Sequence, residues 1–526
     1  MTLTGTNYIA GESSAEGSQT FTAVNPATGK ELDTRFHAAT EQEVDRAAQA
    51  AEAAFESYRN STPDQRHRYL TAIAEEIMAL GDALIERCCA ESGLPAGRIT
   101  GERGRTVNQL KLFAEVAREG SWVDARIDRA QPDREPVPKP DVRSMLRPLG
   151  PVAVFGASNF PLAFSVAGGD TASALATGCP VVAKAHPSHP GTCELITRAI
   201  HRATERCGLA AGVFSLVQGH THESGGRLVG HPAIKAVGFT GSYGGGKALF
   251  DAANRRAEPI PVYAEMGSSN PVFILPGALR ERGEEIARGL TQSVTLGVGQ
   301  FCTTPGLVFL EAGAAVAPFR EAVAENFRGV DAAVMLSESI RAAYEGGVRD
   351  LSAANGVEKL AEGKSANTGY TGTARVFTTT ADRYLADPEL QEEVFGPSTV
   401  LVTGDRRDEL LKSARALHGH LTATLFGTEE DLAEYQDLVA ILEGKVGRLI
   451  VNNFPTGVEV CHSMVHGGPF PATTAAATTS VGTRAILRFA RPVCYQNFPS
   501  FLLPPALRDD NPLGLRRMID GSWGTH

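Results

Sequence analysis

The sequence predicts an α/β protein whose core is a doubly wound parallel sheet. From residue 151 onward, short apolar segments alternate regularly with amphipathic helical segments, as they do in parallel βαβ units. A second α/β stretch follows residue 270, and a polar, proline-rich segment at residues 126–141 interrupts the chain before the first stretch. The sequence therefore indicates two α/β stretches and, at residues 126–141, a linker or an excursion such as an extended arm.

The individual elements follow from local patterns. Apolar residues recur every three or four positions between residues 41 and 89, which predicts helices there, with a new helix starting at Pro63. Strands are then predicted at residues 152–156, 180–185, 213–219, 235–241 and 261–267. Helices are predicted between them at residues 164–178, 192–208, 223–230 and 243–257. In the second stretch a helix is predicted at residues 284–299 and a strand at residues 307–311, and the tail after Asn497 is expected to be an extension or a partly ordered appendage.

Composition and charge exclude several classes of protein. Of the 526 residues, 42% are hydrophobic and 21% charged, which is typical of globular proteins. The net charge of -10 argues against a nucleic-acid or anionic membrane partner. The N-terminus lacks the features of a secretory signal, and no apolar run is long enough to span a bilayer. Because the eight cysteines include no CxxC pair, we expect a reducing, cytoplasmic compartment.

A glycine-rich turn at residues 241–248 invites a phosphate-loop interpretation. Gly241, Gly246 and Lys247 match most of the GxxxxGK[ST] pattern, but Ala248 replaces the hydroxyl residue that would hold Mg²⁺. A nucleotide hydrolase is therefore disfavoured. The turn opens a predicted helix, so it can still bind a pyrophosphate through backbone N–H groups, or it is a tight turn without a ligand.

The segment KAHPSHP at residues 184–190 follows a predicted strand and bears on nucleotide choice. It offers Lys184, His186, Ser188 and His189, with no acid before Glu194, and His222 follows the next strand. Such sheets use an acid to bind an adenosine ribose 2′-hydroxyl and basic groups to accommodate a 2′-phosphate, so this composition favours NADP over NAD. Two alternatives remain: solvent-exposed histidines without a ligand, and an HxxH metal pair, which the intervening proline and the lack of a carboxylate disfavour.

Three further residues form a candidate catalytic set. Asn159 follows a predicted strand, where its amide can donate to an oxyanion or cap a helix. Glu265 lies at the end of another predicted strand, where it can act as a base, a helix cap or an ion-pair partner. Cys302, in GVGQFCTTPG, is a packing residue or a nucleophile. Taken alone, each of these residues is most simply explained by a structural role. Together they supply a donor, a base and a thiol at one edge of an α/β scaffold, which favours covalent catalysis.

These residues lie in strings that resemble the aldehyde dehydrogenase superfamily. The similarity runs from NYIAGE at residues 7–12 to about Asn497 and includes GASNFPL, VVAKAHPS, GFTGS, EMGSSNP, GQFCT, EEVFGP and NNFPTGVEV. The longer strings KAHPSHPGTCEL and FPTGVEVCHSMVHGGPFPATT resemble the NADP-preferring α-ketoglutarate semialdehyde (2,5-dioxopentanoate) dehydrogenases. A bacterial long-chain fatty aldehyde dehydrogenase is similar in the same stretches.

The resemblance implies a role for each matching residue. Cys302 corresponds to the nucleophile, Glu265 to the general base and Asn159 to the oxyanion donor. The residues that correspond to cofactor contacts are Lys184 for the adenosine ribose, Gly241, Ser242 and Gly246 for the pyrophosphate, and Glu393 and Phe395 for the nicotinamide ribose. His186 and Ser188 are added to this cofactor set, and no metal is expected. Two departures stand out: Ser158 replaces a common tryptophan, and Pro187 replaces a common acid, which agrees with NADP.

The resemblance also implies a reaction and a division of the chain. We expect an aldehyde to be oxidised to a carboxylic acid through a thiohemiacetal and a thioester on Cys302, with 2,5-dioxopentanoate as the substrate and an aliphatic aldehyde as the alternative. Arg103 or Arg105 is a candidate anchor for a substrate carboxylate. The expected parts are a Rossmann-type cofactor domain at residues 1–125 and 147–269, a catalytic domain at 270–455, oligomerisation segments at 126–146 and 480–500, and a C-terminal extension at 501–526. A homodimer or homotetramer is expected.

Overall fold

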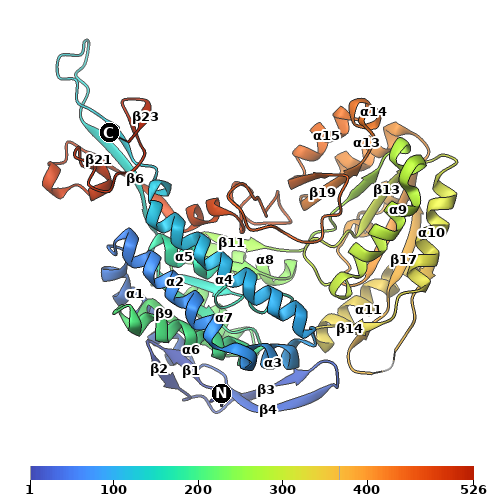
Figure 1. Ribbon diagram of the computed structural model, residues 1–526, viewed down its shortest axis with the longest axis horizontal. Helices are drawn as coiled ribbons and strands as arrows, with labels where there is room; N and C mark the ends of the chain where they lie inside the picture. The colour runs from blue at the N-terminus through green and yellow to red at the C-terminus, as the bar shows by residue number, and fades with distance from the viewer. Residues whose placement is uncertain (1, 367, 526) are drawn as a thin grey trace.

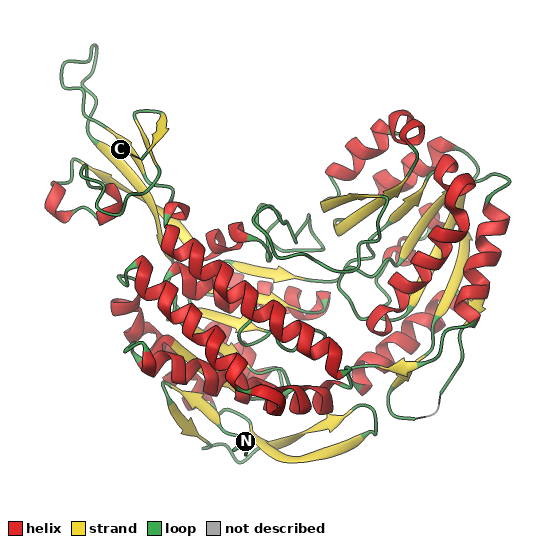
Figure 2. Cartoon of the chain, in the orientation of Figure 1, coloured by secondary structure: helices red, strands yellow, loops and turns green. Residues whose placement is uncertain are grey.

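Two seven-stranded sheets form the body of the protein, and a five-stranded sheet projects from it as an arm (Figure 1). The computed structural model describes residues 2–366 and 368–525. Figure 2 shows helices packed around both seven-stranded sheets, whereas the arm consists of strands, loops and two short 3-10 helices, η6 (Ser500–Leu502) and η7 (Pro505–Leu507). The α/β class with parallel sheets predicted from the sequence is therefore confirmed.

The first sheet is doubly wound. Its strands are, in spatial order, β11 (Val262–Glu265), β10 (Ala236–Thr240), β7 (Val152–Phe155), β8 (Val181–Lys184), β9 (Phe214–Val217), β1 (Asn7–Ile9) and β2 (Glu12–Ser14). The five strands from β11 to β9 are parallel, and the chain leaves β7 outward in both directions. The change of direction therefore lies between β7 and β10, which is where such sheets bind their ligands.

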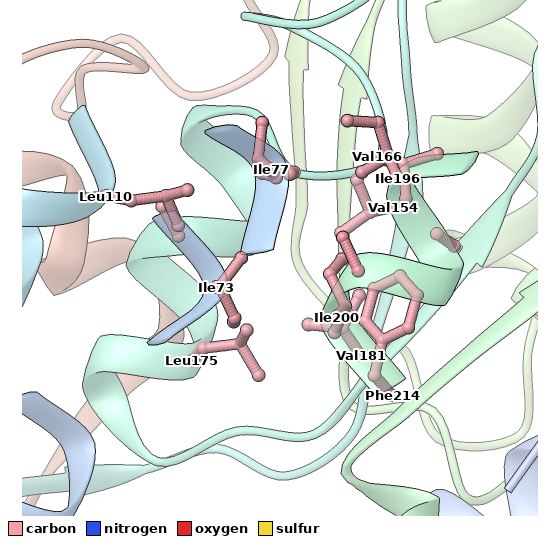
Figure 3. Packing of buried hydrophobic residues seen from close by; sticks show 14 of the residues in the cluster. Ile73, Ile77, Leu110, Val154, Val166, Leu175, Val181, Ile196, Ile200 and Phe214 are labelled. Carbon is pink, nitrogen blue, oxygen red and sulfur yellow. The ribbon is translucent and has the colours of Figure 1, made fainter. Parts of the chain in front are cut away.

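Helices cover both faces of this sheet and bury its apolar side chains. The helices are α1 (Glu41–Tyr58), α2 (Pro63–Ala79), α3 (Gly81–Ser92), α4 (Ala96–Glu119), α5 (Gly169–Thr177), α6 (Pro190–Arg206), α7 (Glu223–Gly230) and α8 (Tyr243–Asn254). Figure 3 shows Ile73 of α2 and Leu175 of α5 in the buried cluster that also contains Val154 and Val181 of the sheet. Capping boxes at Thr40 and Thr62 explain why α1 and α2 begin where they do.

Two predicted helices have different bounds in the structure because of tight turns beside them. The helix expected at residues 164–178 begins only at Gly169, because the chain before it turns tightly: a Cβ on Gly168 would lie 2.6 Å from the Ala163 carbonyl oxygen. The helix expected at residues 284–299 is part of α9 (Pro276–Thr295), and Gly297 and Val298 behind it have φ of 58° and 60°. These left-handed residues end the helix and direct the chain toward Cys302.

The second sheet has the spatial order β15 (Glu358–Glu362), β17 (Arg375–Thr380), β18 (Ser398–Gly404), β13 (Leu307–Glu311), β12 (Val272–Ile274), β19 (His420–Phe426) and β20 (Val446–Val451). All strands except β15 are parallel to their neighbours. Its helices are α9, α10 (Val316–Arg328), α11 (Glu338–Ala353), α12 (Ala381–Ala386), α13 (Arg407–Ala416), α14 (Glu429–Glu434) and α15 (Gln436–Glu443). Between β20 and the 3-10 helix η5 (Thr483–Phe489) the chain has no helix and no strand beyond one isolated bridge at Thr473 (Figure 2).

The arm joins segments that are far apart in the sequence. Its strands, in spatial order, are β21 (Ala490–Gln496), β6 (Val142–Pro148), β5 (Arg126–Asp128), β22 (Arg517–Ile519) and β23 (Ser522–Gly524). The tail is therefore not a loose appendage, because β22 pairs in parallel with β5 and Leu507 is fully buried in the arm. A pair of long strands, β3 (Thr20–Asn25) and β4 (Lys30–His37), lies apart near the N-terminus (Figure 1).

No helix in residues 2–366 and 368–525 is long and apolar enough to cross a bilayer.

Candidate active site

Cys302 lies on the turn that connects α9 to β13. The segment before it passes very close to the loop before β18: Gly299 has φ of 66°, and a Cβ there would lie 2.2 Å from the backbone of Gly396. Only glycine tolerates this combination of a left-handed conformation and a close backbone approach. The local sequence therefore holds the thiol at a fixed place between the two sheets.

His466 connects Cys302 to Glu265. The Cys302 Sγ lies 3.4 Å from His466 Nε2, which in turn lies 2.6 Å from a Glu265 carboxylate oxygen. Ser480 donates a hydrogen bond of 2.5 Å to the other oxygen of Glu265. The imidazole is fully buried and the carboxylate is 3% exposed, so these contacts are shielded from bulk water. His466 Nε2 makes both contacts, so the imidazole lies beside the thiol and the carboxylate and can pass a proton between them.

His466 and Ser480 were not predicted. Both lie in the irregular chain between β20 and η5, and neither follows a strand, so periodicity gave no reason to place them at the site. His466 belongs to one of the strings that carried the family resemblance, but no role was inferred for it. The three donor atoms of Glu265, Cys302 and His466 lie within 4.8 Å of one another. The expectation that the site uses no metal stays a prediction.

The protonation of the site is set by burial and charge. Burial raises the pKa of the Cys302 thiol well above its usual value, and the Glu265 and Glu393 carboxylates add to this rise, while Arg105 and Arg448 oppose it. Burial also acts to raise the pKa of Glu265, but His466 and Ser480 outweigh it, so the Glu265 pKa is lowered overall. The site therefore holds a protonated thiol and an ionised carboxylate.

Asn159 reaches the same place from the first sheet. It follows β7, its side chain is 9% exposed, and its amide Nδ2 donates a hydrogen bond of 2.9 Å to the Gln300 carbonyl oxygen. The Asn159 amide is thus adjacent to the Cys302 turn. All three predicted catalytic residues therefore converge, and their roles stay predictions.

Lys184 and His186 differ in charge at the end of β8. Burial lowers the pKa of Lys184 to about 8, and its ammonium donates a hydrogen bond to the Gly219 carbonyl oxygen. Burial, His189 and Lys184 lower the pKa of His186 well below its usual value, and the His186 Nδ1 accepts a hydrogen bond of 3.1 Å from the Ser188 N–H. His186 is therefore neutral at pH 7, so of these two side chains Lys184 supplies the positive charge.

His189 does not belong to the cofactor loop. It is fully buried, its Nε2 lies 3.1 Å from the Ala157 carbonyl oxygen, and its Nδ1 lies 3.3 Å from the Cys193 Sγ. The two rings of the HPSH segment stack with centroids 5.1 Å apart, and no third donor completes a metal site around them in the described part of the chain. His222 is exposed on the loop after β9.

The turn after β10 fits a pyrophosphate. Ser242 caps α8, its hydroxyl accepting a hydrogen bond of 3.2 Å from the Gly245 N–H, and a side chain on Gly244 would meet no atom within 4 Å. The first turn of α8 is therefore open, with backbone N–H groups and the positive end of the helix dipole available to an anion. On Gly246, a Cβ would lie 2.7 Å from the Met266 side chain, so this glycine lets α8 pack closely on β11. The residues present fit a dinucleotide that spans the turn and Lys184.

Glu393 and Phe395 line a pocket next to the Cys302 turn. The pocket also includes Ser268, Ser269, Gly299 and Thr304. Burial raises the pKa of Glu393 to about 7. A Cβ on Gly267 would lie 2.4 Å from the Glu393 carboxylate, so the glycine after β11 makes room for this side chain.

Arg103 and Arg105 point to different places. Arg103 Nη1 donates a hydrogen bond of 3.0 Å to the Gly81 carbonyl oxygen at the start of α3. Arg105 donates to the Val458 carbonyl oxygen in the irregular chain that also carries His466. Of the two candidate anchors, only Arg105 therefore contacts a segment of the site.

Known proteins are similar to this chain over nearly its whole length. Its sequence matches the family described as "Aldehyde dehydrogenase family" over residues 13–469. It is 51% identical to alpha-ketoglutaric semialdehyde dehydrogenase 2 of Azospirillum brasilense, with 99% of each chain covered. It is 44% identical to the alpha-ketoglutaric semialdehyde dehydrogenase of Acinetobacter baylyi, with 98% of each chain covered.

The fold also has solved counterparts. A crystal structure of betaine aldehyde dehydrogenase from Staphylococcus aureus in complex with NAD+ superimposes with a TM-score of 0.80 at 21% identity, covering 95% of this chain and 96% of the other. The family match, the two relatives and the shared fold agree with one another. This chain belongs to the aldehyde dehydrogenase family and is an NAD(P)-dependent aldehyde dehydrogenase.

Proposed function

We propose that this enzyme oxidises 2,5-dioxopentanoate (α-ketoglutarate semialdehyde) to 2-oxoglutarate with NADP⁺ as the acceptor. The observation that carries the chemistry is the contact of the Cys302 thiol with the His466–Glu265 pair. The names of the two full-length relatives support the substrate. The net reaction is aldehyde, NADP⁺ and water giving carboxylic acid, NADPH and a proton.

The first half of the reaction builds a thioester on Cys302. As the Sγ attacks the aldehyde carbon, the thiol proton passes to the Glu265 carboxylate by way of His466. The Nε2 atom gives its own proton to Glu265 and accepts the one from Sγ. The C–S bond forms while the carbonyl electron pair moves onto oxygen. Asn159 donates to this oxyanion after leaving the Gln300 carbonyl oxygen, which it contacts in the present structure. The nicotinamide nucleotide, when bound, supplies the two-electron acceptor that turns the thiohemiacetal into a thioester.

The second half releases the product. Glu265 first releases the thiol proton to solvent, since His466 and Ser480 lower its pKa and favour its ionised form. It then accepts a proton from a water molecule as the water oxygen adds to the thioester carbon. The C–S bond then breaks, and the thiol recovers its proton. Ser480 holds the second carboxylate oxygen, which orients Glu265 for this step.

The proposed cofactor residues are those predicted from the sequence. Lys184 contacts the adenosine ribose or its 2′-phosphate, the turn at Gly241, Ser242 and Gly246 contacts the pyrophosphate, and Glu393 and Phe395 contact the nicotinamide ribose. The absence of an acid before Glu194 supports NADP over NAD. Because His186 is neutral, we propose that it and Ser188 shape this site without adding charge.

Three expectations about the whole chain are proposed on the same basis. We propose the domain division given above, with the dinucleotide on the first sheet and Cys302 on the second. We propose a cytoplasmic location. The eight free cysteines support it, because thiols stay reduced in that compartment. We also propose a homodimer or homotetramer, supported by apolar side chains exposed on the arm.

A substrate panel tests the function. Formation of NADPH is measured with 2,5-dioxopentanoate, pentanal and decanal, each with NADP⁺ and NAD⁺. The highest kcat/KM is expected for 2,5-dioxopentanoate with NADP⁺. A higher value for decanal would favour the long-chain aldehyde alternative, and nucleotide hydrolysis without aldehyde would favour the phosphate-loop alternative that Ala248 opposes.

A further inference from the structure

Two arginines from different elements meet at one short segment near the nucleophile. Arg105 of α4 donates to the Val458 carbonyl oxygen. Arg448 of β20 donates hydrogen bonds of 3.1 Å to the Gly457 carbonyl oxygen and 2.7 Å to the Pro455 carbonyl oxygen. Both guanidinium groups therefore donate to carbonyl groups of one short segment, residues 455–458.

Neither arginine has an anionic partner. Among the described residues, no carboxylate oxygen lies within 4.0 Å of either guanidinium. The Nε and Nη2 atoms of Arg105 and the Nε atom of Arg448 are buried and make no hydrogen bond. Buried charged donors without partners are costly. The pair therefore has unused capacity for an anion.

The carboxylates nearest to Arg105 are already engaged or point to solvent. Glu102 accepts hydrogen bonds from the Leu162 and Ala163 N–H groups and pairs with Arg98. Glu265 is held by His466 and Ser480, and Glu459 is exposed, with an oxygen accepting from the Val460 N–H. The charge on Arg105 is thus left for a group from outside the chain.

The arginine pair is close to the reacting sulfur. The Arg105 guanidinium carbon lies 5.6 Å from the centre of the Phe164 ring, and this ring lies 6.2 Å from the His466 ring, which contacts Cys302. Both arginines act to lower the pKa of the Cys302 thiol, so both positive charges interact electrostatically with the sulfur. Phe164, Val458 and Met464 belong to one small apolar cluster, and Arg105 contacts the first two of these residues.

We propose that Arg105 and Arg448 together bind the carboxylate of the aldehyde substrate while its aldehyde carbon lies at Cys302. This proposal rests on the proposed function and adds to it the residues that select a short-chain aldehyde carrying a carboxylate at its far end. In 2,5-dioxopentanoate the carboxylate and the aldehyde are at opposite ends of a five-carbon chain, so the methylene groups lie against the apolar cluster. Guanidinium groups match a carboxylate through two parallel N–H···O bonds, which the free Nε and Nη2 atoms of Arg105 can supply.

The same geometry disfavours the long-chain alternative. An alkyl chain entering past Phe164 would cover the guanidinium groups with apolar carbon and leave their buried donors unpaired. A carboxylate at that position removes this cost. The arginine pair is therefore a specificity element and not a part of the bond-making chemistry.

The test compares one charged and one uncharged aldehyde of equal length. In Arg105→Gln and Arg448→Gln, the KM for 2,5-dioxopentanoate is expected to rise about 10- to 100-fold, with a smaller change in kcat. This is the loss of affinity expected when one hydrogen bond to a charged group is removed. The kcat/KM for pentanal is expected to stay within about threefold of wild type or to increase, because the alkyl chain no longer covers the charged guanidinium that was replaced. Activity with pentanal also shows that each variant is folded.

Arg103→Gln is the matched control, since Arg103 is on the same helix but contacts Gly81, and it is expected to resemble wild type with both substrates. Equal losses with both aldehydes would overturn the proposal and indicate a structural role for the arginines, as would unchanged kinetics with 2,5-dioxopentanoate. Product inhibition by 2-oxoglutarate during pentanal oxidation gives a separate readout, expected to weaken in both variants. If the wild type oxidised pentanal but not 2,5-dioxopentanoate while 2-oxoglutarate still inhibited it through these arginines, the proposed substrate would fail and the carboxylate site would stand.

Discussion

At the scale of single residues, the site is built so that its thiol stays protonated until it is used. Burial and two carboxylates hold the pKa of Cys302 well above its usual value, and the imidazole that contacts Sγ provides a place for the proton. A thiolate exposed to solvent is open to oxidation, whereas a buried thiol is not. Attack on substrate therefore requires proton transfer within the site itself.

Substitutions of the nucleophile and of the base are expected to have different kinetic signatures. Cys302→Ala should reduce aldehyde-dependent NADPH formation to background, because no thioester can form. Glu265→Gln should still form the thioester but hydrolyse it slowly, giving a burst of one NADPH per active site followed by a rate lowered by about 10²-fold or more. Stopped-flow measurement of NADPH distinguishes the two. Substantial turnover in Cys302→Ala would contradict the mechanism.

His466 is expected to be required for rapid turnover and not for folding. The substitution His466→Phe keeps an aromatic ring against Phe164 but removes the nitrogen that contacts both Sγ and Glu265. We expect kcat to fall about 10²-fold, the usual contribution of a proton-transferring side chain, while the melting temperature changes little.

The control for this substitution is His201→Phe, at a buried histidine that packs against Tyr8 and Phe214 in the first sheet's core. This variant should retain kcat. A His466→Phe enzyme with normal kcat would show that the thiol loses its proton by another route.

Lys184 gives the nucleotide affinity a pH dependence. Its pKa of about 8 means that the ammonium form dominates below pH 8 and the neutral amine above it. The KM for NADP⁺ is therefore expected to rise with pH above 8, approaching about tenfold per unit, since the charged fraction falls tenfold per unit. Lys184→Gln should raise this KM at pH 7 and flatten its pH profile. Lys235→Gln, at a partly exposed lysine before β10, should do neither. A wild-type KM that stays constant from pH 7 to 9 would refute this role.

At the scale of elements, the strand ends of the first sheet carried most of what could be predicted. The residues at the ends of β7, β8, β10 and β11 were found from the sequence because apolar strands alternate with amphipathic helices, and parallel strands end on one edge. His466 and Ser480 escaped this reasoning because their segment has no periodicity, and its position depends on contacts made across the whole fold. The early start predicted for α5 was wrong for a related reason: the tight turn at Gly168 is a tertiary feature that local pattern does not reveal.

The turn that carries Cys302 is expected to tolerate no side chain at Gly299. A Cβ there would meet the Gly396 backbone at 2.2 Å in a left-handed conformation, so Gly299→Ala must displace the turn or the loop that leads to β18. A displacement of about 1 Å is expected to lower kcat about 10²-fold, with a lower melting temperature as well. Gly313→Ala, where a side chain would meet nothing within 4 Å, should leave both unchanged. Normal activity in Gly299→Ala would show that this close approach is not needed.

At the scale of the whole molecule, the site is assembled from parts that are distant in the sequence. The first sheet provides Asn159 and Glu265, the turn before β13 provides Cys302, and the irregular chain beyond β20 provides His466. The bridge between Glu265 and Thr473 fastens this irregular chain to the end of β11. The arm likewise combines strands from residues 126–148 with strands from residues 490–524, which is why the tail could not be predicted to be ordered from its own composition.

The arm is expected to be the surface through which copies of the chain associate. Phe498, Phe501 and Leu502 are 44%, 77% and 55% exposed on the chain that follows β21. Neighbouring apolar side chains this exposed are typical of protein interfaces, and a sheet edge at β21 lies beside them. The double substitution Phe501→Ser with Leu502→Ser should therefore shift the enzyme to a smaller species in sedimentation velocity, while its melting temperature stays close to wild type.

Trp523→Ser is the control for this double substitution. Trp523 is 46% exposed, but it lies against Arg126 and Arg516 at the opposite edge of the arm, on β23. An unchanged sedimentation coefficient in the double variant would place the interface elsewhere, and a monomeric wild type would reject the proposed oligomer altogether.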